Sequence, residues 1–392
     1  MLTLKQKLED HEYFWHILDT CFPVKGVAAR RGYDWEAIRE SSRRAVEGSK
    51  DDLEFFRAMD GIVRAFKEPD RERFLCHLRI FEPARHREYQ SSFQQYRKID
   101  GNDRLLPWIE PLFREHSEAF YSQFEDRAAG IHLKGTVDPT LNEGDSITFG
   151  ADSKGENVDF RIIEEGRIAC IHVRSLNNLK VEEDRPKIFE FLKSIEGYKH
   201  LILDFRDNGG GATRYWQQLL VAPTTTGSLS IDTYMGIPAC EENRQYFDPA
   251  KLTPISELPE LPALVPEDIA PLTHFMHSRY RVDPDLEHGW FRGKIWVLFS
   301  KTTYSSAESF AVFCRHSGWA TLVGEKTGGD GIGITPLHYA MPNSGIMWRF
   351  SGVYGINPDG SSSQVEGTTP HILCEKEKAL EVCLAEIEKE DK

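Results

Sequence analysis

Two short apolar runs, each next to a helical pattern, constrain the fold of this chain most strongly. "HLILDF" (residues 200–205) follows the amphipathic run "RPKIFEFLKSIEGYKH" (185–200), and "KIWVLFS" (294–300) precedes another. Strand, helix and strand in that order are typical of a sheet flanked by helices. Further strands are predicted at 320–325, 333–341 and 345–350, and a charged helix is predicted from residue 375 onward. We therefore predict an α/β fold for this part of the chain.

The N-terminal third has helical periodicity instead. Apolar residues recur there at spacings of three and four, which is the repeat of an amphipathic helix. The predicted helices cover residues 3–22, 34–49, 51–68 and 103–126. Ser49 or Asp51 is the expected cap of the third helix, because a short polar side chain can accept the first free backbone N–H groups.

These patterns divide the chain into three expected parts. They are an N-terminal helical domain (1–127), a small β or linker segment (128–165) and the α/β domain (166–392). Period-two alternation over 146–176 predicts a hairpin that turns at "EEGR". Residues 222–290 are rich in proline and acidic residues, so we expect a long irregular connection there, as in a lid or substrate wall.

The charge and the hydropathy of the chain exclude several classes of partner. Acidic residues outnumber basic ones by 62 to 48, for a formal net charge of −14. A nucleic-acid partner requires a basic surface, so we expect none. No apolar run approaches the roughly 18 residues that a membrane span needs, and the charged first residues do not resemble a signal peptide. We expect a cytoplasmic protein.

The cysteines give no sign of a metal site or of a disulfide framework. Seven of them are scattered along the chain without a C-x-x-C pair, a pattern that suits free thiols in a reducing compartment. There is also no H-E-x-x-H motif. We expect neither a metal nor a cofactor.

The segment "LILDFRDNGGG" (201–211) is the first candidate for chemistry. Glycines that follow a strand can direct backbone N–H groups at an anion, either a phosphate or a tetrahedral oxyanion. The alternative is a flexible turn. The segment matches neither G-x-G-x-x-G nor a phosphate-binding loop with Lys-Ser/Thr, so we do not expect it to bind a nucleotide.

The segment "TTYSSAESFAVF" (302–313) is the second candidate. Taken alone, Ser305 and Ser306 would most simply cap a helix, with Glu308 as an acidic residue of its first turn. A serine at this turn could also act as a nucleophile if a base removed its proton and donors stabilised the oxyanion.

Together the two segments resemble the C-terminal-processing (tail-specific) serine peptidases. That family includes the tricorn core protease and the repeats of interphotoreceptor retinoid-binding protein. Its pattern is an apolar strand, "D-x-R-x-N-x-G-G", a second apolar strand, "T/S-x-S-x-x-E" and "G-E-x-T-x-G". This chain has "LILDFRDNGGG", "KIWVLFS", "TTYSSAESF", "LVGEKTGGDG" and then "PDGSSSQVEGTTPHI" in the same order, over roughly residues 155–375. The resemblance implies a crotonase-like (ClpP/crotonase-type) catalytic domain with an N-terminal helical domain.

The resemblance also assigns roles to residues of the two turns. Ser305, three positions before the glutamate, corresponds to the nucleophile. The oxyanion donors would be the backbone N–H groups of Ser306 and of Gly210 or Gly211, with the motif favouring Gly211. Tyr304 and Cys76 are expected at the substrate.

The general base is the point at which this chain departs from the tail-specific branch. A lysine follows "G-E-x-T-x-G" in that branch, but here the position is Asp330, and Lys326 lies four residues earlier. The tricorn-like branch uses a histidine from the N-terminal region and a glutamate near "EG-x-x-P", which correspond to His77 and Glu366. The competing histidines are His86, His316, His338 and His371.

We therefore predict a serine endopeptidase that cleaves peptides or C-terminal protein segments through an acyl-enzyme on Ser305. Its partner would be a peptide or protein substrate, with self-association left open. No PDZ-like stretch is evident over 128–165. The alternative is a non-catalytic relative that binds a peptide or a hydrophobic ligand. A third hypothesis is a crotonase-type enzyme that acts on coenzyme A thioesters, but this hypothesis leaves the serine turn unexplained.

Overall fold

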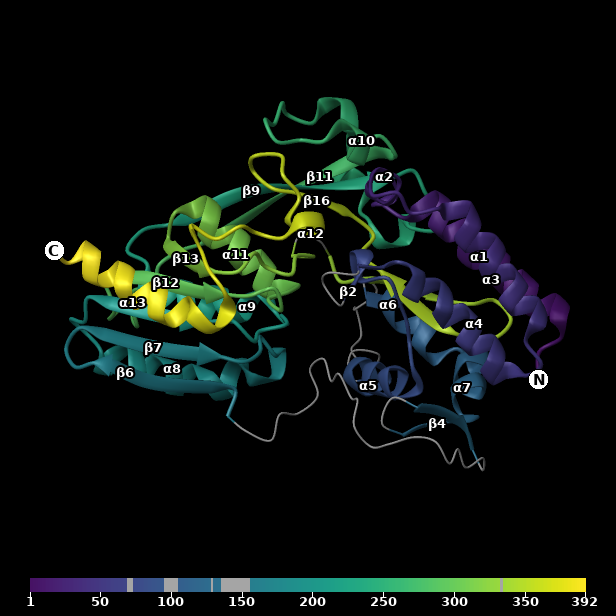
Figure 1. Ribbon diagram of the computed structural model, residues 1–392, viewed down its shortest axis with the longest axis horizontal. Coiled ribbons are helices and arrows are strands. Elements are labelled where there is room, and N and C mark those ends of the chain that lie inside the picture. The colour runs from purple at the N-terminus through teal and green to yellow at the C-terminus, as the bar shows by residue number, and fades with distance from the viewer. Residues whose placement is uncertain (69–72, 95–104, 128–129, 135–155, 332–333) are drawn as a thin grey trace.

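The computed structural model describes residues 1–68, 73–94, 105–127, 130–134, 156–331 and 334–392 (Figure 1). The part of the predicted hairpin over 146–155 and the Gly333 end of the strand predicted at 333–341 lie outside these residues. The N-terminal helices lie on one side of the molecule and a large sheet with its helices lies on the other. The two chain ends are at opposite sides of this view.

A six-stranded sheet forms the centre of the α/β half. Its strand order is β17-β13-β12-β8-β7-β6, and only β6 runs antiparallel to its neighbour. The bounds are Ile372–Leu373, Ala320–Gly324, Lys294–Phe299, His200–Asp204, Ile168–Val173 and Val158–Glu164, in that order. The predicted strands at 200–205, 294–300 and 320–325 are confirmed, as is the turn between β6 and β7.

Helices cover both faces of this sheet, which explains why its middle strands are apolar throughout. The alternate residues Leu201, Leu203 and Val297 pack in one buried cluster with α8 (Val181–Ser194), α9 (Thr213–Trp216) and α11 (Ser306–Ser317). Their neighbours Ile202 and Trp296 pack on the other face against α13 (Ala379–Glu390), the predicted C-terminal helix. Burial on both faces requires an apolar side chain at every position, as expected for a parallel sheet between helices.

The segment 222–290 is not an irregular connection, so that prediction was wrong. It contains β9 (Leu229–Pro238) and β11 (Leu272–Val282), two long antiparallel strands. Together with β10 (Thr253–Pro254) and β16 (Tyr354–Ile356) they form a separate four-stranded sheet. The alternation of polar and apolar residues in both strands fits a sheet with one face in water, and the prolines that suggested a loop lie mainly between the strands.

The predicted strands 333–341 and 345–350 do not join the central sheet. They form the hairpin of β14 (Leu337–Ala340) and β15 (Met347–Phe350), and β15 pairs with β3 (Arg79–Ile80). This third sheet therefore joins the N-terminal region to the C-terminal half. The pairing brings the segment around residue 77 next to the α/β half.

The predicted N-terminal helices are present, with additional short elements between them. Asp51 caps α4 (Asp52–Ala65) by accepting a hydrogen bond from the Glu54 N–H at 2.8 Å. The other α-helices of this region are α1 (Leu4–Cys21), α2 (Lys25–Arg30), α3 (Trp35–Gly48), α5 (Pro83–Gln94), α6 (Leu106–Ile109) and α7 (Glu115–Tyr121). Its strands are β1 (Lys67–Glu68), β2 (Arg73–Phe74), β4 (Phe124–Arg127) and β5 (Gly130–Leu133). The short helices α10 (Pro266–Ile269) and α12 (Ser363–Glu366) follow later in the chain.

One hydrophobic core runs through the N-terminal region and into the C-terminal half. Phe14 and Phe22 of the first helix region pack in the same buried cluster as Trp348 and Phe350 of β15. The boundary predicted after residue 127 separates β4 from β5, which pair with each other, and β6 of the predicted middle segment belongs to the central sheet. The N-terminal helices therefore depend on residues more than 300 positions away for part of their burial.

Cys21 and Cys240 form a disulfide, which corrects the expectation of free thiols for this pair. The two residues are 219 positions apart, at the end of α1 and just after β9. In the chain-entropy view, a cross-link over so long a loop stabilises a fold by roughly 5.4 kcal/mol. Cys76, Cys170, Cys314, Cys374 and Cys383 are free. None of the helices within the described ranges is both long and apolar enough to cross a membrane.

Three buried histidines of this shared core predict a loss of stability in acid. Burial lowers the pKa of His11 and His86 to about 4 and that of His338 to about 3. A histidine of the unfolded chain has a pKa of about 6.5. Below that pH the unfolded chain binds protons that these folded imidazoles do not, so the free energy of unfolding decreases as the pH is lowered. Each histidine costs about 2 kcal/mol at pH 5. Urea unfolding should show a lower midpoint at pH 5 than at pH 7.5; an equal or higher midpoint at pH 5 would contradict this.

Candidate active site

Ser305 lies at the sharp turn between β12 and α11. It has the N-cap position of α11, but its φ of 58° and ψ of −123° are not those of an ordinary cap. Its side chain makes no capping hydrogen bond. The backbone is held instead, since the Ser305 N–H donates to the carbonyl of Gly329 at 3.0 Å. The hydroxyl is therefore not used to stabilise the helix, contrary to what a simple cap would require.

The glycine turn after β8 packs directly against this serine. Arg206 donates two hydrogen bonds to Asp204 at 2.9 and 2.7 Å, and Asn208 donates to the Val173 carbonyl at 2.9 Å. Gly210 follows with a φ of 107°. A Cβ atom at Gly210 would lie 2.8 Å from the Ser305 Cβ, so only glycine allows the two turns to approach this closely. The Asp-Arg-Asn motif thus fixes the position of the glycines.

Two backbone N–H groups remain available at the junction of the turns. Within the described residues, neither the Gly211 N–H nor the Ser306 N–H has a hydrogen-bond acceptor. The Gly210 N–H is used already, because it donates to Asn208 Oδ1 at 2.9 Å. The Cβ position built at Gly210 lies 3.0 Å from the Ser306 nitrogen. Ser306 is the first residue of the 12-residue helix α11, where backbone dipoles favour negative charge.

His77 comes to the site from the N-terminal region and contacts Asp330. His77 Nδ1 lies 2.5 Å from Asp330 Oδ2, and both side chains are largely buried. The Ser351 Oγ lies 3.1 Å from the same nitrogen. With Nδ1 engaged by these oxygen atoms, Nε2 is the ring nitrogen left to exchange a proton.

Tyr304 connects this pair to the serine turn. Its hydroxyl donates a hydrogen bond to the carboxylate of Asp330, and its ring lies 4.9 Å from the His77 ring, centroid to centroid. Because Tyr304 immediately precedes Ser305, the histidine and the carboxylate are held beside the nucleophile turn.

Strained backbone is concentrated at this site. In the described part of the chain, Cys76, His77, Ser305 and Asp330 are the non-glycine residues with positive φ, between 56° and 60°. Left-handed backbone costs roughly 1–2 kcal/mol at such residues and persists where the surroundings enforce it. The strained backbone at this site therefore comes from three separate segments, around residues 76–77, 305 and 330.

Glu308 anchors the loop that carries Asp330. The side chain is fully buried, and its carboxylate accepts hydrogen bonds from the Gly329 N–H at 3.1 Å and from the Thr368 hydroxyl at 2.6 Å. The Asp330 N–H donates to the Gln364 carbonyl at 3.1 Å. The glutamate of the serine motif is therefore a structural link between α11 and this loop.

Comparison with known proteins decides the family. A model of peptidase family S41 matches residues 167–374, more than half of the chain. The chain belongs to peptidase family S41. The matched range covers Ser305, the glycine turn and Asp330, whereas His77 lies before it.

Solved structures agree with this S41 assignment at the level of the fold. A candidate peptidase from Parabacteroides merdae is 13% identical, with a TM-score of 0.57 over 98% of this chain and 96% of its own. Mature CPAF in complex with lactacystin is also 13% identical, with a TM-score of 0.56 over 98% and 97%. A search of curated protein sequences found no significant match. The fold of this S41 protein is mixed α/β, with an N-terminal helical region and a ClpP/crotonase-like core.

Two of the residues predicted for the S41 site are already engaged in other contacts. Glu366 is partly exposed and forms ion pairs with Arg31 at 3.0 Å and Lys326 at 3.6 Å. Cys76 is buried, and its thiol donates to the Ser351 carbonyl at 3.2 Å. Burial also raises the pKa of this thiol. The roles predicted for Glu366 and Cys76 stay predictions.

The competing histidines of this S41 protein have structural partners elsewhere. The ring of His86 stacks on Tyr121. His338 is buried beside the Trp108 carbonyl, and His371 accepts a hydrogen bond from the Leu322 N–H at 3.0 Å. His316 lies in the last turn of α11, at the opposite end of the helix from Ser305.

Sequence reasoning assigned no role to Asp330 and did not single out Ser351. Asp330 attracted notice only because it stands where the resemblance led us to expect a lysine. Its position beside the family motif was the available signal, since a carboxylate there can orient a histidine base. Ser351 follows β15 with no motif around it, so nothing in the sequence pointed to it.

Proposed function

We propose that this chain is a serine endopeptidase with Ser305 as nucleophile and His77 as general base. The observation that carries the proposal is the contact of His77 with Asp330 beside the strained Ser305 turn. In the proposal Asp330 takes the orienting role that the resemblance gave to Glu366. The use of a histidine in place of a lysine matches the tricorn-like branch of the family.

The proposed reaction has two halves. His77 Nε2 accepts the proton of the Ser305 hydroxyl as Oγ attacks the scissile carbonyl carbon. The N–H groups of Gly211 and Ser306 stabilise the negative charge that develops on the carbonyl oxygen. The imidazolium returns its proton to the leaving amine, which departs and leaves an ester on Ser305. Water activated by the same histidine then hydrolyses the ester.

Asp330 and its neighbours would prepare the histidine for this task. A carboxylate at Nδ1 holds the tautomer in which Nε2 is unprotonated, and it stabilises the imidazolium that forms. The Tyr304 hydroxyl donates to the same carboxylate, which limits its movement. The expected substrate is an extended peptide or an unstructured protein segment, in the cytoplasm.

Digestion of an unfolded protein substrate tests the proposal. The full chain is incubated with reduced, alkylated casein at neutral pH, and released peptides are identified by mass spectrometry. We expect new N-termini to appear in proportion to time and enzyme, and to be suppressed by a fluorophosphonate but not by a metal chelator. If no peptides are released but the protein binds uncleaved casein, the result would instead support the non-catalytic alternative.

A further inference from the structure

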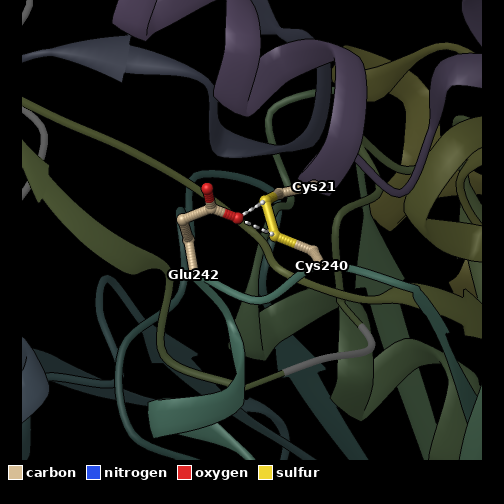
Figure 2. A group of neighbouring side chains, drawn as sticks. All are labelled: Cys21, Cys240 and Glu242. Atoms are coloured by element: carbon tan, nitrogen blue, oxygen red, sulfur yellow. Dashed lines mark hydrogen bonds between the residues drawn. A yellow bond between two sulfur atoms is a disulfide. The ribbon is translucent and has the colours of Figure 1, made fainter.

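A second cluster of reactive side chains surrounds the Cys21–Cys240 disulfide, away from Ser305. Figure 2 shows the Glu242 carboxylate directed at both sulfur atoms. Its Oε2 lies 3.6 Å from Cys21 Sγ and 3.3 Å from Cys240 Sγ. The other oxygen, Oε1, lies 2.8 Å from His16 Nε2. One carboxylate therefore joins the two sulfur atoms to a histidine of α1.

The Glu242 carboxylate faces different sulfur chemistry in the oxidised and the reduced state of Cys21 and Cys240. Oxidised sulfur has no proton to donate, so the disulfide offers the facing carboxylate oxygen no hydrogen bond. In the reduced, deprotonated state the three groups would be two thiolates and a carboxylate within 4.8 Å of one another. Such a concentration of negative charge is stabilised by a cation, and two thiolates select a borderline-soft metal such as Zn²⁺.

We propose that the reduced protein binds one Zn²⁺ through Cys21, Cys240 and Glu242. Three protein ligands leave a fourth position for water, and His16 would orient the Glu242 carboxylate through its hydrogen bond. Disulfide and metal are alternatives at the same place, because sulfur atoms joined to each other cannot both bind the metal as thiolates. The site lies outside the proposed catalytic residues and does not depend on them.

Reduction of the Cys21–Cys240 disulfide takes up two electrons and two protons. Two thiol groups of a small-molecule reductant supply two electrons, the Cys21–Cys240 bond breaks, and the reductant becomes a disulfide. The two protons pass to Cys21 and Cys240. Zn²⁺ then displaces both protons into solvent as two sulfur–zinc bonds form.

Both the disulfide and the proposed zinc site would connect the end of α1 to the segment after β9. Cys21 is the last residue of α1, and Cys240 and Glu242 follow β9, whose partner β16 leads to α12. Gln364 of α12 accepts a hydrogen bond from the Asp330 N–H. The zinc form would keep this connection in a reducing cytoplasm, where the disulfide would be lost.

Metal content measured in the two redox states tests the proposal. The full chain is reduced with a phosphine, desalted under nitrogen, mixed with equimolar ZnCl₂ and desalted again. We expect reduced protein to retain about one zinc per chain and oxidised protein almost none, as for a site that requires thiolates. With Co²⁺ in place of Zn²⁺, the reduced protein should show a thiolate-to-cobalt charge-transfer band.

Matched variants separate this site from nonspecific binding. Glu242→Gln keeps both cysteines and should weaken zinc affinity at least about tenfold. The double variant Cys21→Ser/Cys240→Ser should lose the cobalt band, whereas Cys374→Ser, which removes a partly exposed free thiol, should retain it. Equal zinc content in reduced and oxidised protein, or unchanged affinity in Glu242→Gln, would overturn the proposal.

Discussion

Ser305→Ala is expected to lower kcat for peptide cleavage by about 10⁴- to 10⁶-fold, the cost of removing the nucleophile of a serine triad. The change deletes one oxygen atom and leaves the backbone N–H of Ser305 bonded to Gly329. The strained φ of 58° remains in the variant, so the fold around the turn should be kept. Steady-state kinetics on a peptide released from casein, with circular dichroism as a check on folding, measure the effect.

Ser306→Ala is the matched control for this variant. Its hydroxyl is buried without a hydrogen-bond partner in the described ranges, and its proposed contribution is the backbone N–H, which alanine retains. We expect kcat close to that of the unmodified chain. Equal losses in the two variants, or cleavage by Ser305→Ala at an undiminished rate, would contradict the choice of Ser305.

Asp330→Asn is expected to lower kcat by about 10⁴-fold, as the loss of the orienting carboxylate does in a serine triad. Asparagine has nearly the same shape, but its amide can donate to Nδ1 and favour the tautomer with the proton on Nε2. That tautomer cannot accept the Ser305 proton. KM should change much less than kcat, because Asp330 is buried and is not expected to contact substrate.

Glu366→Gln distinguishes the two carboxylates that could serve His77. Glu366 pairs with Arg31 and Lys326 and is partly exposed, so its loss should alter stability slightly and leave kcat nearly unchanged. A large loss of kcat in Glu366→Gln together with a small one in Asp330→Asn would reverse the assignment of the orienting carboxylate.

The sequence predicted those parts of the fold and site that depend on local pattern. The apolar runs at 200–205 and 294–300 are central strands, and the serine between β12 and α11 lies on the predicted turn. The glycine turn lies against it because both follow neighbouring parallel strands, whose carboxyl ends meet at one edge of the sheet. A short motif on each strand was enough for these predictions.

The remaining features depend on contacts between distant segments. The pairing of β3 with β15 places His77 at the site, and no local pattern signals a two-residue strand. Asp330 reaches His77 because Glu308 and Gln364 fix its loop in a left-handed conformation. The Cys21–Cys240 bond spans 219 positions with no spacing rule to reveal it. In the segment 222–290, proline and charge between the strands obscured their alternation.

Mapping a fluorophosphonate adduct on the native full chain tests the central claim most directly. The reagent phosphonylates a serine only when a base and oxyanion donors activate its hydroxyl. We predict a single adduct on Ser305, formed at a rate that falls sharply in Asp330→Asn and is lost in urea. An adduct on another residue of the folded protein, or none on Ser305 in a preparation that cleaves casein, would contradict the account.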